Sequence, residues 1–510
     1  MRRTLLLALF LVLIGATAAG TWSYFMWNRS DELLRKTVLE RLEEMFPDYD
    51  ISIARARLDF QGRIHAHGLR WTVGEARERF IDADEVILTI DGGRLADSNP
   101  LVRRLEVVRP RVWLTRHASG TWNVTGLPPP RRTPGVLPEW TLSPLKVQLR
   151  VEREGDLEPL EHSLENASLQ LTAIGRRQYK FRLGGRSSLA ETLRVEGSWH
   201  LDARNWGVAG DLTRLRADDS LLDLLTEFSP EFQAGLRRSL RAITDRVTPP
   251  GEVSEPGSAV ADEEETKSPL RLGITALGDL NLDVKKSGPD EPLEYRVRVQ
   301  LHDGAIAHPP LDFPLTDLQG RATINNQQIE FREVTGRSGP IGLSIPLAHI
   351  ENEGEIRPAH FELHLTELPL DDRVVALLPP APRKIYLDCR PTGRVDVHVA
   401  AETEGTGPWK VEWAVNPRDC TARHVQFPYL VEGVEGEIAQ RDGVVRADLH
   451  ATAGRQPVKF SGKTLNPGPE AESHYEITAD GMPIDNRLRE AAPPQLQKVI
   501  DALQIGRAHV

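Results

Sequence analysis

Neighbouring acidic residues are the feature of this sequence that most suggests catalysis. An acidic or acid–amide pair occurs three times, each time directly before a short apolar segment with helical spacing. Two adjacent carboxylates can act as general acid and general base, but the sequence nearby offers neither a nucleophile nor a set of metal ligands. Carboxylates in this position also accept hydrogen bonds from the free N–H groups of a first helical turn, and we interpret them as helix caps. The pairs are Asp218 with Asp219, Asp371 with Asp372, and Asp485 with Asn486.

Histidine and cysteine are the other side chains that could do chemistry. His65 and His67 are two apart in a strand-like segment, so they share one face and could hold a metal. With no third ligand in view, the sequence predicts solvated or hydrogen-bonded imidazoles and no metal site. Cys389 and Cys420 are too few for a disulfide framework. They could pair in an oxidising compartment or remain two isolated thiols.

Motifs of common enzyme classes are missing from the sequence. It has no Gly-x-Ser-x-Gly, no His-Glu-x-x-His and no phosphate-binding loop. We therefore predict a protein that is not an enzyme and that needs no cofactor. The net charge is −11, from 63 Lys and Arg against 74 Asp and Glu, which disfavours a nucleic-acid partner.

An internal repeat positions the acidic pairs. Three anchors recur at one offset, because 427 − 313, 482 − 368 and 493 − 379 all equal 114. A weaker copy precedes them by 371 − 218 = 153 residues, and the polar segment 247–268 accounts for the extra length. That segment is acidic and rich in Pro and Gly, so we expect a disordered loop. The repeats span 140–246, 269–382 and 383–496. The anchors are Phe313-Pro314 with Phe427-Pro428, Leu368-Pro369 with Met482-Pro483, and Pro379-Pro380 with Pro493-Pro494.

Each repeat changes from strand spacing to helix spacing. In the second repeat, Phe361, Leu363 and Leu365 alternate with polar residues, as in a half-buried strand. Helical spacing follows until Pro379 and Pro380, which should stop the helix within two turns. The helix of the first repeat is longer and should span 220–243. We predict a mainly β fold of repeated antiparallel β-meander modules, each closed by one short helix.

The N-terminal part reads as a membrane anchor followed by a separate β module. Residues 4–27 are uncharged and about long enough to cross a bilayer as a helix, so we assign 1–27 to an N-terminal transmembrane helix. Cleavage of a signal peptide near residues 16–18 is the alternative. An amphipathic helix over 30–45 should pack on the first sheet, within a module that spans 28–126. The Pro-rich segment 127–139 is then an extended connector.

The C-terminal end departs from the repeat pattern. Residues 497–504 begin a further helix, whereas 505–510 (IGRAHV) match the translation of a sequencing adapter. We therefore expect the native chain to continue with further repeats beyond this point.

Four short segments resemble the AsmA-like family, the bacterial relatives of bridge-like lipid transfer proteins. They are Leu105–Leu114, Ser119–Asn123, Phe427–Tyr429 and Met482–Asp485. The resemblance implies an elongated, curved β-groove in the periplasm that is anchored in the inner membrane. It implies passive transport of phospholipid between the inner and outer membranes, in outer-membrane biogenesis. A partner protein of the outer membrane or envelope would then bind the far end.

Alternating apolar residues supply the candidate lining of such a groove. Two strands, one in each of the last two repeats, carry these residues at an offset of 114 with charged residues between them. The pattern fits a lipid-lined groove and equally a closed sandwich of two sheets. In the second case the chain would be a structural or regulatory envelope scaffold that binds proteins. The candidate lining residues are Tyr295, Val297, Val299, Leu301, Trp409, Val411, Trp413 and Val415.

Overall fold

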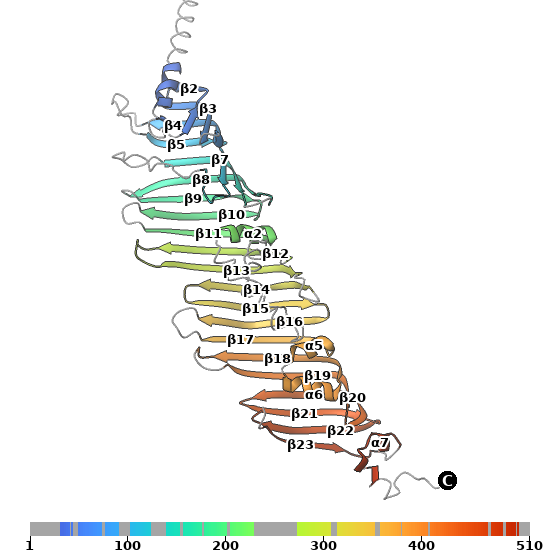
Figure 1. Cartoon of the computed structure of the whole chain (residues 1–510). Helices are drawn as coiled ribbons and strands as arrows, with labels where there is room; N and C mark the ends of the chain where they lie inside the picture. The colour runs from blue at the N-terminus through green and yellow to red at the C-terminus, as the bar shows by residue number, and fades with distance from the viewer. Residues whose placement is uncertain are drawn as a thin grey trace, which may run out of the picture. The chain divides into compact units, whose positions relative to one another are not determined.

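In a computed structural model the chain is mainly β, as predicted (Figure 1). The structure describes residues 31–40, 42–43, 49–73, 77–90, 102–123, 139–153, 157–175, 178–200, 205–228, 273–307, 314–351, 358–378, 380–405, 409–467, 471–482, 486–495 and 497–498. Two compact units are present, and we treat each by itself. Unit 1 comprises the described residues up to Leu215 with Asp279–Tyr295, and unit 2 comprises those of Arg216–Gly278 and Arg296–Val510. These limits differ from those of the predicted repeats.

Unit 1 contains a mixed sheet. Most of its neighbouring strands are antiparallel, but β5 and β6 both run parallel to β7. These parallel pairs join the N-terminal module to the first predicted repeat, and the strands within that repeat, β7 to β11, are antiparallel as predicted. A parallel pair requires a long return connection, and 22 residues separate β6 from β7 (139 − 116 − 1). The strands are β1 (Tyr49–Ser52), β2 (Arg55–Leu58), β3 (Arg63–Val73), β4 (Glu78–Ile90), β5 (Val102–Val108), β6 (Arg111–Arg116), β7 (Glu139–Val151), β8 (Leu160–Gly175), β9 (Gln178–Ser187), β10 (Thr192–His200) and β11 (Asn205–Asp218).

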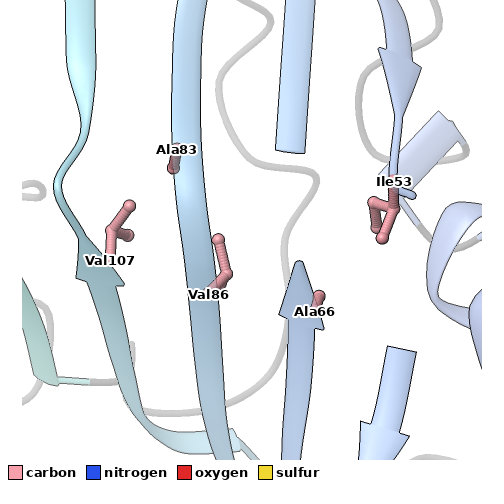
Figure 2. Packing of buried hydrophobic residues seen from close by; sticks show 5 residues of the cluster. All are labelled: Ile53, Ala66, Ala83, Val86 and Val107. Atoms are coloured by element: carbon pink, nitrogen blue, oxygen red, sulfur yellow. The ribbon is translucent and has the colours of Figure 1, made fainter. Parts of the chain in front are cut away.

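A helix covers the first strands of unit 1, as the amphipathic pattern predicts. Residues 31–40 and 42–43 are helical, and Val38 and Leu42 pack against a cluster of buried side chains from the sheet. Arg57 Nε on β2 lies 3.1 Å from Asp31 Oδ2 and ties the start of the helix to the sheet. Figure 2 shows the cluster, in which small and β-branched side chains fill the space between strands. It consists of Ile53, Ala66, Ala83, Val86 and Val107.

Unit 2 is an antiparallel meander. From β13 to β23 each strand is hydrogen-bonded to the next one along the chain. β11, β12 (Ile274–Lys286) and β13 have residues in both units. The strands are β13 (Leu293–Ile306), β14 (Leu315–Asn325), β15 (Gln328–Ser338), β16 (Ile341–Glu351), β17 (Ala359–Pro369), β18 (Thr392–Thr403), β19 (Lys410–His424), β20 (Phe427–Arg441), β21 (Val444–Ala453), β22 (Gln456–Leu465) and β23 (Glu472–Ala479).

The 114-residue period is visible in the elements themselves. Strands β12 to β17 are followed by α5 (Asp372–Leu377), and β18 to β23 by α7 (Asn486–Ala491). The two helices match at both ends, since 486 − 372 and 491 − 377 equal 114. Helix α2 (Asp219–Phe228) precedes α5 by 372 − 219 = 153 residues, which is the predicted offset of the first copy. The described part of α2 agrees with the predicted helix as far as residue 228.

The helix ends confirm the predicted cap at Asp218 and correct the predicted number of helices after the second repeat. Asp218 Oδ1 accepts hydrogen bonds from the backbone N–H groups of Ser220 and Leu221 at 3.0 and 3.1 Å, so this acid is a helix cap. A second helix, α6 (Pro380–Cys389), follows α5, so the prediction of one closing helix per repeat is wrong for the second repeat. Pro380 is the first residue of α6, where a missing backbone N–H costs nothing and a fixed φ favours the helix.

Several predicted segments lie outside the described residues. They are the anchor 1–27, the connector apart from Glu139, the acidic loop 247–268, and the C-terminal residues 499–510. Glu139 itself is the first residue of β7. Within the portion of the chain that the structure describes, no helix combines the length and apolar character needed to span a bilayer.

Candidate functional site

One face of the unit 2 sheet carries rows of apolar residues that cross many strands. Directly paired residues of neighbouring strands share a face, so the register identifies each row. The first row joins β13 to β19 and contains only Val, Ala and Phe. We call this side of unit 2 the apolar face. In order, the row is Val299, Ala322, Phe331, Ala348, Phe361, Ala401 and Val411.

A second row continues the apolar face from β16 to the last strand. It shares the face of the first row, because Phe361 and Leu365 are four residues apart in an uninterrupted part of β17. The two rows together reach from β13 to β23. In order, the second row is Leu343, Leu365, Val397, Val415, Ile438, Ala447, Gly462 and Tyr475.

The apolar face is only partly covered. Phe331 and Val411 are 40% and 43% exposed, and Tyr475 on the last strand is 43% exposed. Most other members of the two rows are half-buried. Among the described residues of unit 2, the buried hydrophobic side chains are mainly alanines. A closed sandwich would bury large side chains on this face, and the described part of unit 2 lacks that kind of core.

Small helices cover the margins of the sheet in unit 2. α7 contributes Ala491 and Leu488 to a cluster with Tyr429 of β20 and Ala453 of β21. The partly buried Val458 of β22, on the apolar face, packs against the same cluster. Two large apolar side chains of α6, Ile385 and Leu387, are 65% and 53% exposed. Among the described residues, α7 therefore covers part of the apolar face, and most members of both rows are half-buried or exposed.

The eight predicted lining residues divide into two groups. Val297, Val299 and Leu301 lie on β13, and Val411, Trp413 and Val415 lie on β19, all on the apolar face of unit 2. Trp409 directly precedes β19, is 53% exposed and falls on the same face by alternation. Tyr295 is half-buried and belongs to unit 1. Six strand steps of about 4.8 Å separate β13 from β19, so the two groups share a face at roughly 29 Å from each other.

Sequence reasoning missed much of the apolar face between those groups. Phe331 and Phe361 belong to the first row, and Leu365 belongs to the second. The alternation of Phe361, Leu363 and Leu365 identifies a half-buried strand. That pattern gives a period for each strand but no register between strands, so it could not join these residues to Val299 or Val411.

The opposite face of unit 2 is polar. The row next to the first apolar row contains only charged residues, histidines and one threonine. Arg332 donates to Glu330 at 2.7 Å, and this hydrogen bond keeps the pKa of Glu330 below its usual value. In order, the row is Arg298, Thr323, Glu330, His349, His360, Glu402 and Lys410. The sheet thus has one water-facing side and one apolar side.

Unit 1 also carries a row of apolar residues across its strands. Its apolar row begins in the buried cluster under the N-terminal helix. From β8 onward, Leu169, Leu183 and Val195 are only half-buried. The row crosses eight strands in the order Ala66, Val86, Val107, Leu142, Leu169, Leu183, Val195 and Gly210.

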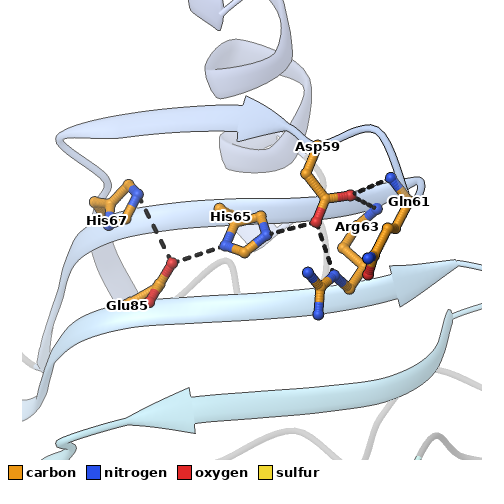
Figure 3. Close-up of polar contacts among 6 residues, drawn as sticks. All are labelled: Asp59, Gln61, Arg63, His65, His67 and Glu85. Carbon is orange, nitrogen blue, oxygen red and sulfur yellow. Dashed lines mark hydrogen bonds and ion pairs between the residues drawn. The ribbon is translucent and has the colours of Figure 1, made fainter.

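The predicted hydrogen bonding of His65 is confirmed. Figure 3 shows its ring between two carboxylates, with Nδ1 2.8 Å from Glu85 Oε1 and Nε2 3.1 Å from Asp59 Oδ2. His67 is farther from Glu85, at 3.8 Å. The hydrogen bond to Glu85 raises the pKa of His65 above its ordinary value. The backbone hydrogen bond from Arg63 is the main cause that lowers the pKa of Asp59. The group forms an ion-pair network.

This network predicts a pH dependence of stability. The pKa of His65 is higher in the folded state than in the unfolded state. Its contribution to the free energy of unfolding is therefore complete below the unfolded-state pKa and is lost as pH rises through the folded-state pKa. At pH 5.5 the variant His65→Gln should be less stable than the parent by about 1 kcal/mol, and the difference should shrink at pH 9. Urea unfolding at both pH values measures this. His67→Gln is the control, and an equal pH response in both variants would contradict the assignment.

The two cysteines are free thiols in the structure. Cys420 is buried on β19, and its Sγ lies 3.0 Å from the carbonyl oxygen of Arg394. Burial raises the pKa of both thiols. Because the thiolate is the reactive form, a raised pKa makes each thiol a weaker nucleophile.

Two of the segments that resemble the AsmA-like family, Leu105–Leu114 and Ser119–Asn123, contain residues with a structural role. Pro110 is fully buried between β5 and β6. Asn123 is buried and clamps β6, because its Oδ1 accepts from Thr115 N at 3.0 Å and its Nδ2 donates to Trp113 O at 2.9 Å. The Pro and Asn of the motif therefore fix the turn and the end of this strand pair.

No model of a known protein family matches the chain, and no curated protein sequence is similar to it. The AsmA-like resemblance therefore remains a hypothesis that rests on the short motifs.

Proposed function

We propose that this chain is an AsmA-like, inner-membrane-anchored periplasmic protein that carries phospholipid passively between the inner and outer membranes. The observation that carries the proposal is the pair of apolar rows across unit 2, most of whose members are half-buried or exposed. Large exposed apolar surfaces on folded proteins usually bind an apolar ligand or partner. Acyl chains match it because they need no directional contacts and can slide from one row position to the next.

The dimensions of unit 2 suit a lipid. A strand of 11 residues is about 36 Å long, and the ten steps from β13 to β23 span roughly 48 Å at the usual strand spacing. Twist and β-bulges bend such a sheet, and register shifts occur in the pairings β14–β15, β16–β17, β18–β19 and β19–β20. In our proposal the sheet curves toward its apolar side and forms a groove. The polar row behind it keeps the outer surface in water.

The mechanism requires no catalytic group. Acyl chains would lie against the apolar face, while the phospholipid head group stays at the open side in water. The N-terminal segment 1–27 would hold one end at the membrane that supplies the lipid. Direction would then come from lipid supply and from partners at the two ends, including an envelope or outer-membrane protein at the far end.

Photocrosslinking tests the proposal on the two faces separately. A benzophenone amino acid at Val299, Phe331 or Val411 should crosslink phospholipid when the chain is expressed in a Gram-negative host. The same group at the neighbouring positions Arg298, Arg332 and Lys410, which face the opposite side, should not. Mass spectrometry of the crosslinked product identifies the lipid. A folded protein that gives no lipid adduct from any apolar position would refute lipid transport and favour the envelope scaffold.

A further inference from the structure

Two histidines and one glutamate converge on the polar face of unit 2. Glu362 and His364 are two apart on β17 and so share a face, and His398 on β18 is paired directly with His364. His364 Nε2 lies 2.9 Å from Glu362 Oε1, and His398 Nε2 lies 3.3 Å from the same oxygen. The three ligand atoms all lie within 4.8 Å of one another. In the part of the chain that the structure describes, this is the sole group of His, Cys, Asp or Glu with such convergence.

The ring nitrogens are aimed inward and are not all satisfied. His398 Nε2 is buried and makes no hydrogen bond within the described residues, although it faces the carboxylate. The two rings lie 4.4 Å apart between centroids and are tilted by 57°. Glu362 Oε1 therefore lies within 3.3 Å of the Nε2 atoms of both imidazoles.

From this geometry we propose that Glu362, His364 and His398 bind a divalent transition-metal ion such as Zn²⁺. Zinc binds imidazole nitrogen and carboxylate oxygen at about 2.0 to 2.2 Å, which places ligand atoms of a tetrahedral site about 3.3 Å apart. The distances at Glu362 Oε1 are close to that spacing. Two imidazoles with one carboxylate form a ligand set that suits zinc and its neighbours better than Ca²⁺ or Mg²⁺.

Water can complete the coordination. The side chains of His364 and His398 are 43% and 42% exposed, and that of Glu362 is 30% exposed. The site is thus open to solvent on one side, and a water molecule would be the fourth ligand. A ring nitrogen that coordinates a metal carries no proton, so any proton displaced on binding is released to solvent.

The site lies where two predicted repeats meet. β17 ends the second repeat and β18 begins the third, and the two strands are joined through α5 and α6. The residues equivalent to Glu362 and His364 are Glu476 and Thr478 at the offset of 114, so the histidine does not recur in the third repeat. A metal bound by both strands would strengthen the contact between neighbouring repeats, on which the stability of a repeat protein depends. The apolar face is not involved, so this site is independent of lipid binding.

Metal titration of the full chain tests the site. The protein is purified without a polyhistidine tag, stripped with a chelator and titrated calorimetrically with ZnCl₂ at pH 7.5. We expect one saturable site, and affinity at least about 100-fold weaker in His364→Ala and in His398→Ala. His360→Ala is the matched control, because this histidine lies on the same strand and face and should leave the affinity unchanged. Lowering the pH to 5.5 should weaken binding at least about tenfold, since imidazole must be unprotonated to coordinate.

A second readout keeps the test decisive if an alanine variant does not fold. Co²⁺ bound to the unaltered chain should give the intense visible absorption of a four-coordinate site, and Glu362→Gln should weaken it. Zn²⁺ should also raise the unfolding temperature of the parent and of His360→Ala, but not that of His364→Ala. Absence of saturable binding and of the Co²⁺ spectrum, or equal weakening in the His360→Ala control, would overturn the proposal.

Discussion

Replacing Val299 and Val411 together by aspartate is expected to reduce co-purifying phospholipid at least tenfold. The two residues begin and end the first apolar row, on β13 and β19. An aspartate at the centre of a bilayer costs about 2.5 to 3.5 kcal/mol, and every 1.4 kcal/mol is a factor of ten in affinity. Acyl chains that lie along this row would have to contact one carboxylate or the other. Lipid is quantified by mass spectrometry after solvent extraction of protein purified in mild detergent.

The matched control moves the same change to the other side of the sheet. Arg298→Asp with Lys410→Asp alters the neighbouring residues of the same two strands, which point to the polar side. This control changes the net charge by twice as much, so a loss of lipid caused by charge alone would be larger in the control. Circular dichroism checks that both variants keep their strands. Equal lipid content in the parent and in the Val variant would contradict lipid contact along this row.

Local patterns in the sequence were enough to predict the repeat and the type of most elements. The offsets of 114 and 153 residues reappear in the starts of α2, α5 and α7. The cap at Asp218 could be predicted because N-capping depends on a carboxylate and the first helical turn alone. Alternation also predicted the side of the sheet on which Val299 and Val411 lie, since the period of a strand is fixed at two.

Features that depend on distant residues could not be predicted. The parallel pairing of β5 and β6 with β7 results from the return of a long connection, and no local pattern records it. The row from Leu365 to Val415 depends on register, which shifts between Leu365 and Leu368. The cluster of Glu362, His364 and His398 was missed for the same reason. Only the pairing of β17 with β18 brings His398 opposite His364.

The proline pair after α5 shows that proline can both end one helix and begin the next. Pro379 and Pro380 were predicted to end the helix, and α5 does end at Leu377. The same ring that stops one helix is well suited to begin the next one, and α6 begins at Pro380. The proline rule therefore locates the break in the helix but does not decide whether a loop or a second helix comes after it.

Val395→Asp is expected to destabilise unit 2 by about 4 kcal/mol or more, whereas Val411→Asp should cost about 1 kcal/mol or less. Both valines belong to unit 2, on the neighbouring strands β18 and β19, but Val395 is 4% exposed and Val411 is 43% exposed. A carboxylate buried without a partner loses its hydration, which costs several kcal/mol. A carboxylate on a half-open face keeps most of its water. Urea unfolding followed by circular dichroism measures both changes.

This comparison separates an open apolar face from a closed sandwich without any lipid. If a second layer covered the apolar face in solution, Val411 would be as buried as Val395, and the two aspartates would be equally damaging. If Val395→Asp fails to fold, the alanine variants give the same contrast, with a loss of about 2 kcal/mol at Val395 and about 0.5 kcal/mol at Val411. A large and equal loss at both sites would mean that unit 2 has a filled core, and the apolar rows would then serve packing alone.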